Sequence, residues 1–493
     1  MLVQALLESA DRFPDKLALA DHAQKLTYAQ LVTLTQAIRR VISEATTCER
    51  VGVMLPASCG TVATIFGGLW AGKTVIPLNF LLQPHELRSV IEDAGIDLVV
   101  GTVHFKPLLE NLPVRALYLE EAGLKRRYVM EKLRRRPPIP QVDPDDVAVI
   151  VYTSGTTGTP KGVCLSYRNF HWNAQAAIDH LKIQSDEHLL GLVPPFHVFG
   201  LTVLNFLPII LGGTVTYIPR FSPQAACKAI AEDGITILLA VPSMYAAIAR
   251  LKSIEPATFS RIRISASGGE PLPRNVYDAV LQRTGLKLIE GYGLTETSPI
   301  ISADLPWAHK PGTVGTALAG IELQLRDDSG TVLPRDAEGE LWVRGPGVMK
   351  GYYRKPEETA RVIDADGWFR TGDIVRIDDE GYISITGRAK DLIIVGGENV
   401  YPREVESVLE MHPSVQEAAV IGQPDGSRGE VVIAFVVLRE GMQATAEELR
   451  AFCRERLAGY KTPRDVIFQP ELPRGPTGKI LKKQLKETLT ARA

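Results

Sequence analysis

Short apolar runs alternate with longer amphipathic segments over roughly the first 300 residues of the chain. Apolar side chains recur at helical spacing over 28–45, where Thr27 and Gln30 predict a capping box at the helix start. Brief apolar runs that predict buried strands lie at 51–56, 74–79, 189–195, 214–219, 235–242, 262–269 and 286–293. The alternation predicts an α/β fold with a large N-terminal domain of doubly wound sheets.

The pattern changes from about Gly312 onward. Short strands are separated there by Asp-Gly, Ser-Gly and Glu-Gly turns, which are typical of antiparallel pairing. From about Asp391 the pattern becomes helix, strand, strand, helix, strand and helix. We therefore expect a small antiparallel β subdomain, followed by a small α+β domain at the C-terminus.

Composition narrows the class of protein. The chain has 493 residues, 45% of them apolar and 23% charged, with a formal net charge of −2. This balance argues against a nucleic-acid binder. The five cysteines are scattered without a CxxC pair, so they indicate neither a disulfide framework nor a zinc site and fit a reducing compartment.

Targeting segments are not indicated either. The N-terminal stretch lacks the basic and apolar regions of a signal peptide. The most apolar segment, 198–215, contains Asn205, Pro208 and two glycines, so it predicts a buried helix that runs into a strand. We expect a cytoplasmic protein with no transmembrane span. The oligomeric state stays open, with a homodimer as one possibility.

A basic segment at 124–140 has two interpretations. It holds seven Lys and Arg residues and ends in prolines. This composition is typical of a solvated surface helix that leads into a rigid linker. The alternative is contact with an acidic partner or with a membrane surface, which would place the protein at the membrane periphery.

The stretch from Val151 to Tyr167 carries the first chemical signal. Its glycines let backbone N–H groups converge on an anion, its hydroxyls donate hydrogen bonds, and Lys161 supplies a positive charge, so it predicts phosphate binding. It is not a Walker A loop, because Gly162 and an apolar strand follow Lys161 where that loop has a helix. The turn therefore joins two strands. The alternative is the polar tip of a hairpin.

Further motifs extend this signal along the chain. They are PPFHVFG (194–200), SGGEPLP (267–273), GYGLTET (291–297), RTGDI (370–374), GRAKDLIIVGGENVYPREVE (387–406) and LPRGPTGKILK (472–482). Together with YTSGTTGTPKGV (152–163), and in this order, they resemble the adenylate-forming superfamily of acyl-CoA synthetases, nonribosomal adenylation domains and beetle luciferases. The resemblance spans nearly the whole chain and favours the fatty-acid–CoA ligase branch.

The resemblance implies a reaction in two halves. A carboxylate attacks the α-phosphorus of ATP to give an acyl-adenylate and pyrophosphate, and a thiol then takes the acyl group and expels AMP. Such chemistry depends on positioning and charge neutralisation, so it needs no protein nucleophile. The implied division is an N-terminal AMP-binding domain at 1–387, a hinge at 388–390 with Lys390, and a mobile C-terminal domain at 391–493.

The resemblance also implies which side chains bind ATP. The β- and γ-phosphates are held by residues of the turn, namely Thr153, Ser154, Gly155, Thr156, Thr157 and Lys161. Adenine lies along a backbone segment and against an aromatic face, formed by Gly268, Gly269, Glu270 and Tyr292. Asp373 accepts hydrogen bonds from the ribose, and Arg388 assists at the ribose or a phosphate.

Four residues take catalytic roles by the same resemblance. Thr295 contacts the α-phosphate, and Glu296 ligates Mg²⁺, a hard cation that prefers carboxylate and phosphate oxygens. Lys479 reaches both the α-phosphate and the substrate carboxylate and lowers their repulsion. His197 is an aromatic gate beside the acyl carbon, with a hydrogen-bonded core histidine as the alternative.

The acyl and thiol sites are indicated less sharply. Candidate walls of the acyl pocket are Phe199, Met244, Tyr245, Gly291 and Leu294. Gly396 and Gly397 let a backbone approach the thin pantetheine arm of coenzyme A or of an acyl-carrier protein.

We therefore predict an acid–thiol ligase that uses ATP, Mg²⁺ and coenzyme A, with a medium- or long-chain fatty acid as substrate. An aromatic or dicarboxylic acid and a carrier-protein acceptor stay open, although no arginine stands at the pocket positions to favour a dicarboxylic acid. A luciferase-like oxidase is an alternative from another class. The intact charged residues of the motifs argue against a non-catalytic relative.

Overall fold

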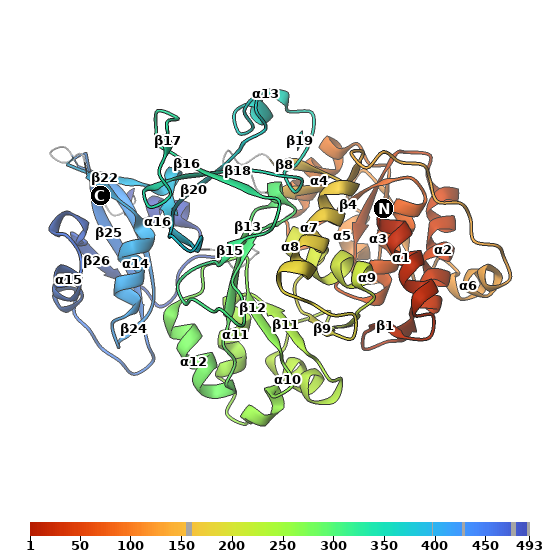
Figure 1. The fold of residues 1–493 in the computed structure, drawn as a ribbon, viewed down its shortest axis with the longest axis horizontal. Coiled ribbons are helices and arrows are strands. Elements are labelled where there is room, and N and C mark those ends of the chain that lie inside the picture. The colour runs from red at the N-terminus through yellow and green to blue at the C-terminus, as the bar shows by residue number, and fades with distance from the viewer. Residues whose placement is uncertain (154–159, 397, 426–428, 475–479, 491–493) are drawn as a thin grey trace.

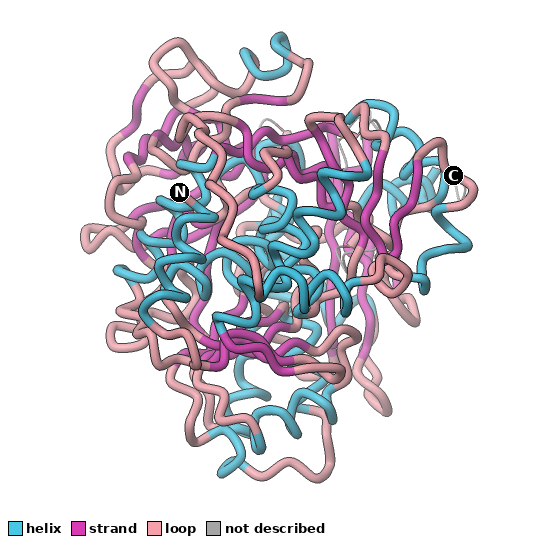
Figure 2. Tube along the Cα trace, turned by 90° about the vertical axis from the view of Figure 1, so that its right-hand side faces the viewer, coloured by secondary structure: helices cyan, strands magenta, loops and turns pink. Residues whose placement is uncertain are grey.

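The computed structural model describes residues 1–153, 160–396, 398–425, 429–474 and 480–490. Within these ranges the chain forms four β-sheets with helices packed around them (Figure 1, Figure 2). The mixed α/β architecture confirms the predicted fold class.

The first sheet has seven strands and contains the two strands that flank the predicted phosphate-binding segment. In spatial order the strands are β19 (Gly351–Tyr352), β8 (Lys161–Ser166), β7 (Val147–Thr153), β4 (Thr74–Pro77), β3 (Arg50–Met54), β5 (Leu98–Gly101) and β6 (Arg115–Tyr118). Strands from β7 to β6 are parallel, whereas β8 runs antiparallel to both β7 and β19. The prediction that the segment before Lys161 joins two strands is therefore confirmed.

The second sheet has nine strands. In spatial order they are β15 (Thr316–Ala317), β14 (Ile300–Ala303), β13 (Ile289–Gly293), β12 (Ile264–Ser267), β11 (Ile237–Ala240), β9 (His188–Gly191), β10 (Thr214–Tyr217), β1 (Leu17–Ala20) and β2 (Lys25–Thr27). The strands from β13 to β1 are parallel, and antiparallel strands close both edges. The predicted apolar runs between 189 and 293 all supply strands of this sheet.

One hydrophobic core joins the two large sheets. Between them lie α2 (Tyr28–Ala45), α3 (Cys59–Trp70), α7 (Tyr167–His180), α8 (Val198–Leu201), the π-turn η2 (Thr202–Phe206) and α9 (Leu207–Leu211). The ring of Phe206 packs 5.6 Å from Phe66 and 4.8 Å from Phe170, measured between centroids. The capping box of Thr27 with Gln30 is present as predicted. Segment 198–215 forms a buried helix leading into β10, also as predicted.

Other helices cover the outer faces of this region. They are α1 (Leu2–Arg12), α4 (Pro84–Ala94), α5 (Lys106–Leu109), α6 (Leu124–Lys132), α10 (Pro223–Glu232), α11 (Pro242–Ala249), α12 (Arg274–Thr284) and α13 (Pro356–Ala360). Across the described ranges, no helix is both long and apolar enough to cross a bilayer.

The third sheet is the predicted antiparallel subdomain. Its strands are β17 (Val332–Leu333), β16 (Glu322–Arg326), β18 (Glu338–Arg344), β20 (Phe369–Ile377) and β21 (Ile383–Arg388). The C-terminal region that follows contains β22 (Ile393–Val395), β23 (Glu398–Val400), α14 (Pro402–Glu410), β24 (Val415–Asp425), β25 (Gly429–Leu438), α15 (Ala446–Arg454), β26 (Asp465–Phe468) and α16 (Lys482–Thr490). In Figure 1 this region lies at one end of the long axis and α6 at the other.

Candidate active site

The edge between β7 and β8 brings two of the predicted phosphate ligands together. Thr153 and Lys161 are paired across the two antiparallel strands. The Lys161 ammonium forms an ion pair with Glu358 of α13 and lies 5.2 Å from the centroid of the Tyr352 ring. Ser154, Gly155, Thr156 and Thr157 lie outside the described residues.

The turn after β13 carries the candidate magnesium ligand. Glu296 lies in the 3₁₀ turn η4 (Thr295–Thr297), and its carbonyl accepts a 2.8 Å hydrogen bond from the backbone N–H of Met349. The Tyr352 hydroxyl donates to Glu296 Oε1 at 2.8 Å. A carboxylate that accepts from one neutral donor keeps most of its lone pairs free. This donor set fits Mg²⁺, which proteins bind through one or two carboxylates while phosphates and waters complete the shell.

A buried carboxylate links the predicted adenine and ribose positions. The β20–β21 register places Asp373 opposite Arg388, whose Nε lies 2.7 Å from Asp373 Oδ1. The Tyr292 hydroxyl donates to Asp373 Oδ2 at 2.6 Å. Asp373 is only 2% exposed, and this burial raises its pKa, an effect that Arg388 and Tyr292 oppose. The structure thus joins three sequence-predicted residues from two sheets.

Two glycines, Gly268 and Gly269, follow the end of β12. A Cβ atom added at Gly268 would lie 3.2 Å from Cζ of Phe199, so the Phe199 ring packs directly against this glycine. Gly269 has a φ of +83°, which favours glycine. Both residues, with Glu270, lie at the carboxyl end of a parallel strand, the position where α/β sheets commonly bind ligands.

Three residues predicted near the acyl carbon have different environments. His197 is half-buried at the start of α8, and its ring centroid lies 6.0 Å from that of Phe196. Tyr245 is buried, and its hydroxyl donates to the carbonyls of Leu238 at 2.8 Å and Ala266 at 3.1 Å. Tyr245 therefore packs in the core and braces β11 against β12. Met244 is partly buried against the same core.

Two other predicted residues lie close to the start of the C-terminal region. Lys390 is exposed in the 3₁₀ turn η5 (Ala389–Asp391), directly after β21. Gly396 has a φ of +62° between β22 and β23, and a Cβ added there would meet no atom within 4 Å. The turn itself therefore favours this glycine. Gly397 and Lys479 lie outside the described residues.

Sequence reasoning missed two residues that touch this site. Tyr352 and Glu358 contact Glu296 and Lys161, respectively. The run GYYRKPEET at 351–359 contains them, but its hydrophobic pattern gives no indication of either contact. The pairing of β19 with β8 brings this run next to Lys161.

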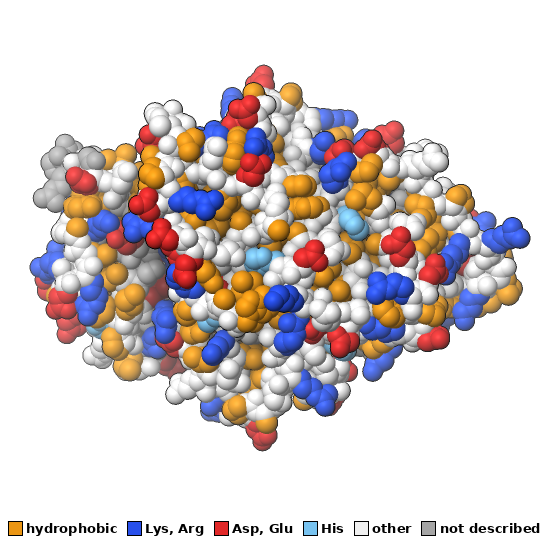
Figure 3. Space-filling view, viewed as in Figure 1, with side chains coloured by type: hydrophobic (Ala, Val, Ile, Leu, Met, Phe, Trp, Pro, Cys, Tyr) orange, Lys and Arg blue, Asp and Glu red, His pale blue; other side chains and the backbone are white. Residues whose placement is uncertain are grey.

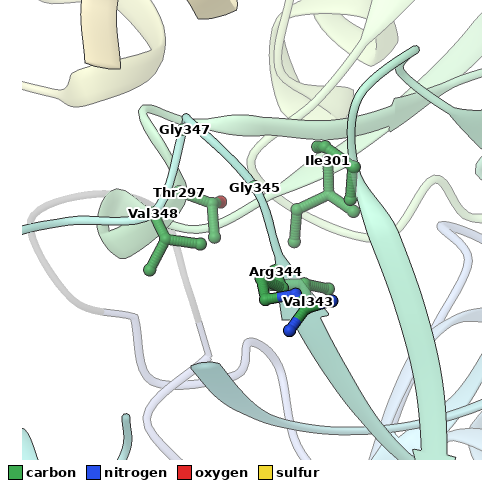
Figure 4. Close-up of a pocket in the computed structure, with 8 residues that line it drawn as sticks. Thr297, Ile301, Val343, Arg344, Gly345, Gly347 and Val348 are labelled. Atoms are coloured by element: carbon green, nitrogen blue, oxygen red, sulfur yellow. The ribbon is translucent and has the colours of Figure 1, made fainter. Parts of the chain in front are cut away.

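Two cavities lie near these elements. One of about 10 Å³, room for about one water molecule, is lined by Thr297, Ile301, Ile321, Val343, Arg344, Gly345, Gly347 and Val348 (Figure 4). It lies beside the turn that carries Glu296. A larger cavity of about 720 Å³ on the antiparallel sheet is lined by residues including Gln324, Arg335, Arg344 and Trp368. None of the sequence-predicted site residues lines either cavity.

Comparison with known proteins establishes the family. The sequence pattern of the AMP-binding enzyme family matches residues 6–353, and that of the AMP-binding enzyme C-terminal domain matches residues 404–479. The chain belongs to the AMP-binding enzyme family. This confirms the adenylate-forming resemblance that the motifs predicted.

Several members of the AMP-binding family are similar over almost the whole chain. The chain is 37% identical to a long-chain-fatty-acid–CoA ligase of Bacillus subtilis, covering 99% of the chain and 94% of that protein. It is 36% identical to a feruloyl-CoA synthase of Amycolatopsis, covering 96% of each. ATP-bound MatB from Rhodopseudomonas palustris superposes with a TM-score of 0.90 at 32% identity and covers 99% of each chain.

Proposed function

We propose that this AMP-binding enzyme is an ATP-dependent acid–CoA ligase. It activates a carboxylic acid as an acyl-adenylate with release of pyrophosphate and then transfers the acyl group to coenzyme A. One observation carries the proposal most strongly, the buried contact of Asp373 with Tyr292 and Arg388 at the predicted nucleoside position. The similarity to CoA ligases over nearly the full length supports it.

The residues divide the work of the first half-reaction. Lys161 and the turn that follows β7 bind the leaving phosphates, while Asp373 accepts hydrogen bonds from the ribose. Glu296 would hold Mg²⁺, which neutralises phosphate charge when bound. Lys479 reduces the repulsion between the substrate carboxylate and the α-phosphate. These groups hold the reactants in place and reduce the repulsion between their negative charges. The carboxylate oxygen then forms its bond to the α-phosphorus as the bond to pyrophosphate breaks.

The domain assignment is part of the proposal. Residues 1–387 form the nucleotide-binding body, 388–390 act as a hinge, and 391–493 move between the two half-reactions. The exposed position of Lys390 in a short turn directly after β21 supports this assignment. A short turn between two sheets can absorb a change in backbone dihedral angles without disturbing a core.

A medium- or long-chain aliphatic acid is the proposed substrate. Phe196 packs edge to face against Phe80 with ring centroids 4.9 Å apart, and Phe199 covers Gly268. These aromatic surfaces beside the nucleoside position suit an apolar chain. They also suit an aromatic acid, which the similarity to a feruloyl-CoA synthase favours.

A panel of acids tests both the activity and the substrate. Acetate, octanoate, dodecanoate, benzoate, ferulate and succinylbenzoate are each supplied with ATP, Mg²⁺ and either coenzyme A or a holo acyl-carrier protein. The proposal predicts AMP and thioester formation with coenzyme A and octanoate or dodecanoate. If no acid gives AMP above the acid-free control, the ligase assignment is wrong. Thioester on the carrier protein alone would transfer the assignment to a carrier-protein ligase.

We further propose that α6 contacts a membrane surface. Three apolar side chains are exposed at its C-terminal end, with Val129 60% and Met130 39% exposed and Leu133, directly after the helix, 87% exposed. Exposed basic side chains with no ion pair among the described residues flank them, namely Lys125, Arg126, Lys132 and Arg135. Figure 3 shows basic and hydrophobic side chains together at this end of the molecule. Apolar groups beside cations suit a bilayer with anionic headgroups.

Sedimentation with lipid vesicles tests this contact. The protein should sediment with vesicles that contain phosphatidylglycerol, less so at high salt, and not with pure phosphatidylcholine. Leu133→Asp should abolish sedimentation, whereas Met442→Asp, at a side chain that is 51% exposed elsewhere, should not. Equal behaviour of the two variants would remove α6 from the membrane contact.

A further inference from the structure

The segment 351–359 lies directly behind the phosphate site. Its first two residues form β19, which pairs with β8, and the backbone N–H of Tyr353 donates to the carbonyl of Gly162 at 2.7 Å. The Thr359 hydroxyl closes the segment, because it accepts from the N–H of Tyr352 at 2.9 Å and donates to the carbonyl of Lys355 at 2.9 Å. These bonds hold the side chains of the segment at fixed positions beside the start of β8.

Two side chains of this segment reach the candidate ATP ligands. Tyr352 donates its hydroxyl to Glu296 Oε1 at 2.8 Å and lies with its ring 5.2 Å from the Lys161 ammonium. Glu358 pairs with the same ammonium, and Lys355 Nζ lies 3.6 Å from its other oxygen. The bond to Lys161 lowers the pKa of Glu358, so this carboxylate is ionised.

We infer that the segment 351–359 modulates the affinity of the phosphate site for ATP and Mg²⁺ through these two contacts. This inference rests on the proposed function. Tyr352 is a positioning residue that orients Glu296 toward the metal. Glu358 is a resting counter-ion that holds Lys161 extended at the site and competes with the phosphates of ATP for it. A carboxylate and a phosphate accept from the same hydrogens of the ammonium group. ATP must therefore displace Glu358 before its phosphates can bind Lys161.

The counter-ion role predicts a change that increases affinity. Glu358→Gln removes the competing charge and should tighten binding of a non-hydrolysable ATP analogue about two- to fivefold, the range expected for a partly exposed ion pair. The gain should shrink at high ionic strength. Glu357→Gln is the matched control, because Glu357 is exposed in the same helix and has no ion pair among the described residues. Calorimetric titration measures both. An unchanged or weaker affinity for Glu358→Gln overturns the counter-ion role.

The positioning role predicts a defect specific to magnesium. Tyr352→Phe should raise the Mg²⁺ concentration for half-maximal analogue binding about 10-fold, as losing the partner of a metal-binding carboxylate commonly does. The KM for the acid should stay unchanged. Tyr353→Phe is the matched control, since its ring faces Arg50 and Arg354. Tyr352 is merely structural if Tyr352→Phe needs the same Mg²⁺ concentration as the wild type for half-maximal binding. The same holds if that concentration rises only in variants whose melting temperature also falls.

The binding readouts separate this inference from the proposed function. Analogue binding requires no acid and no thiol, so it reports on Lys161 and Glu296 whichever substrate the enzyme uses. If the variants behave as predicted but no acid is adenylated, the ligase assignment fails and the phosphate-site inference stands. If acids are adenylated but the variants bind like their controls, only the inference fails.

Discussion

Replacing Asp373 by asparagine distinguishes two properties of this carboxylate. One is its binding of the nucleotide, and the other is the effect of its burial on protein stability. Oδ1 forms an ion pair with Arg388 Nε at 2.7 Å, and Oδ2 accepts from the Tyr292 hydroxyl at 2.6 Å and from Arg388 Nη2 at 3.5 Å. A carboxylate has about four lone-pair sites, so Oδ1 keeps room to accept from a ribose hydroxyl. Asparagine would accept from Arg388 with its oxygen and donate its amide to the Tyr292 oxygen. Both protein contacts survive, while the ribose loses its charged acceptor.

The expected loss in ATP affinity follows from the strength of these bonds. Hydrogen bonds to a charged group contribute about 1.5–3 kcal/mol each, against about 0.5–1.5 kcal/mol between neutral partners. Weakening the ribose bonds therefore costs about 2 kcal/mol, which corresponds to a KM for ATP about 30-fold higher. ATP–pyrophosphate exchange with ATP varied measures it directly.

Stability should change in the opposite direction. Burial raises the pKa of Asp373, so ionising it costs folding free energy at a pH above the folded pKa. Below the unfolded pKa, about 3.9, this cost is absent. Asp373→Asn removes the cost, so its melting temperature should equal or exceed that of the wild type at pH 7.5. The advantage should shrink as the pH falls through the raised pKa toward the unfolded value.

A second aspartate on the same hairpin provides the control. Asp378 accepts a 2.6 Å bond from Lys310 Nζ, which lowers the pKa of Asp378. Asp378→Asn should therefore lower the melting temperature slightly and leave the KM for ATP unchanged. The reasoning is refuted if Asp373→Asn keeps a KM for ATP within twofold of the wild type, or if it melts well below Asp378→Asn at pH 7.5.

Three further predictions follow from the proposed roles. Lys161→Ala should raise the KM for ATP while leaving the KM for the acid unchanged, and an unaltered ATP dependence would remove Lys161 from the site. The specificity constant should rise with aliphatic chain length by up to about 0.8 kcal/mol per CH₂ until the pocket is full, so acetate or benzoate outperforming dodecanoate would exclude a fatty-acid pocket. Lys479→Ala should lose adenylation but still convert supplied acyl-adenylate to thioester, whereas Lys390→Pro should release pyrophosphate in a burst and stall before thioester. A shared defect in one half-reaction would contradict the hinge.

Individual helices and strands could be predicted from the local pattern of apolar and polar residues. The helix at 28–45 begins at Thr27 because the cap residues and the apolar periodicity agree on the same boundary. The strand that begins at Lys161 was predictable because an apolar run, and no helix signal, follows the lysine. In both cases neighbouring residues alone determine the structure.

Contacts between distant residues could not be predicted in this way. Tyr292 and Asp373 are 81 positions apart, and only the packing of β13 against β20 joins them. The pairing of Asp373 with Arg388 depends on a register shift in the β20–β21 hairpin, where the pairs Ile374–Gly387 and Val375–Ile385 differ by one residue. A bulge of this kind has no signal in the alternation of polar and apolar positions. Tyr352 was missed for the same reason, since its partner Glu296 lies far away in the sequence, in the turn η4 between β13 and β14.

The fate of the carboxylate oxygens tests the central claim most directly. An accepted acid labelled with ¹⁸O in its carboxyl group is converted to thioester with ATP and coenzyme A, and the phosphorus products are analysed by mass spectrometry. Attack on the α-phosphorus leaves one acid oxygen on the phosphate when the thiol expels AMP. We predict one ¹⁸O atom in AMP and none in pyrophosphate. Unlabelled AMP, or label in orthophosphate formed together with ADP, would contradict the proposed adenylate mechanism.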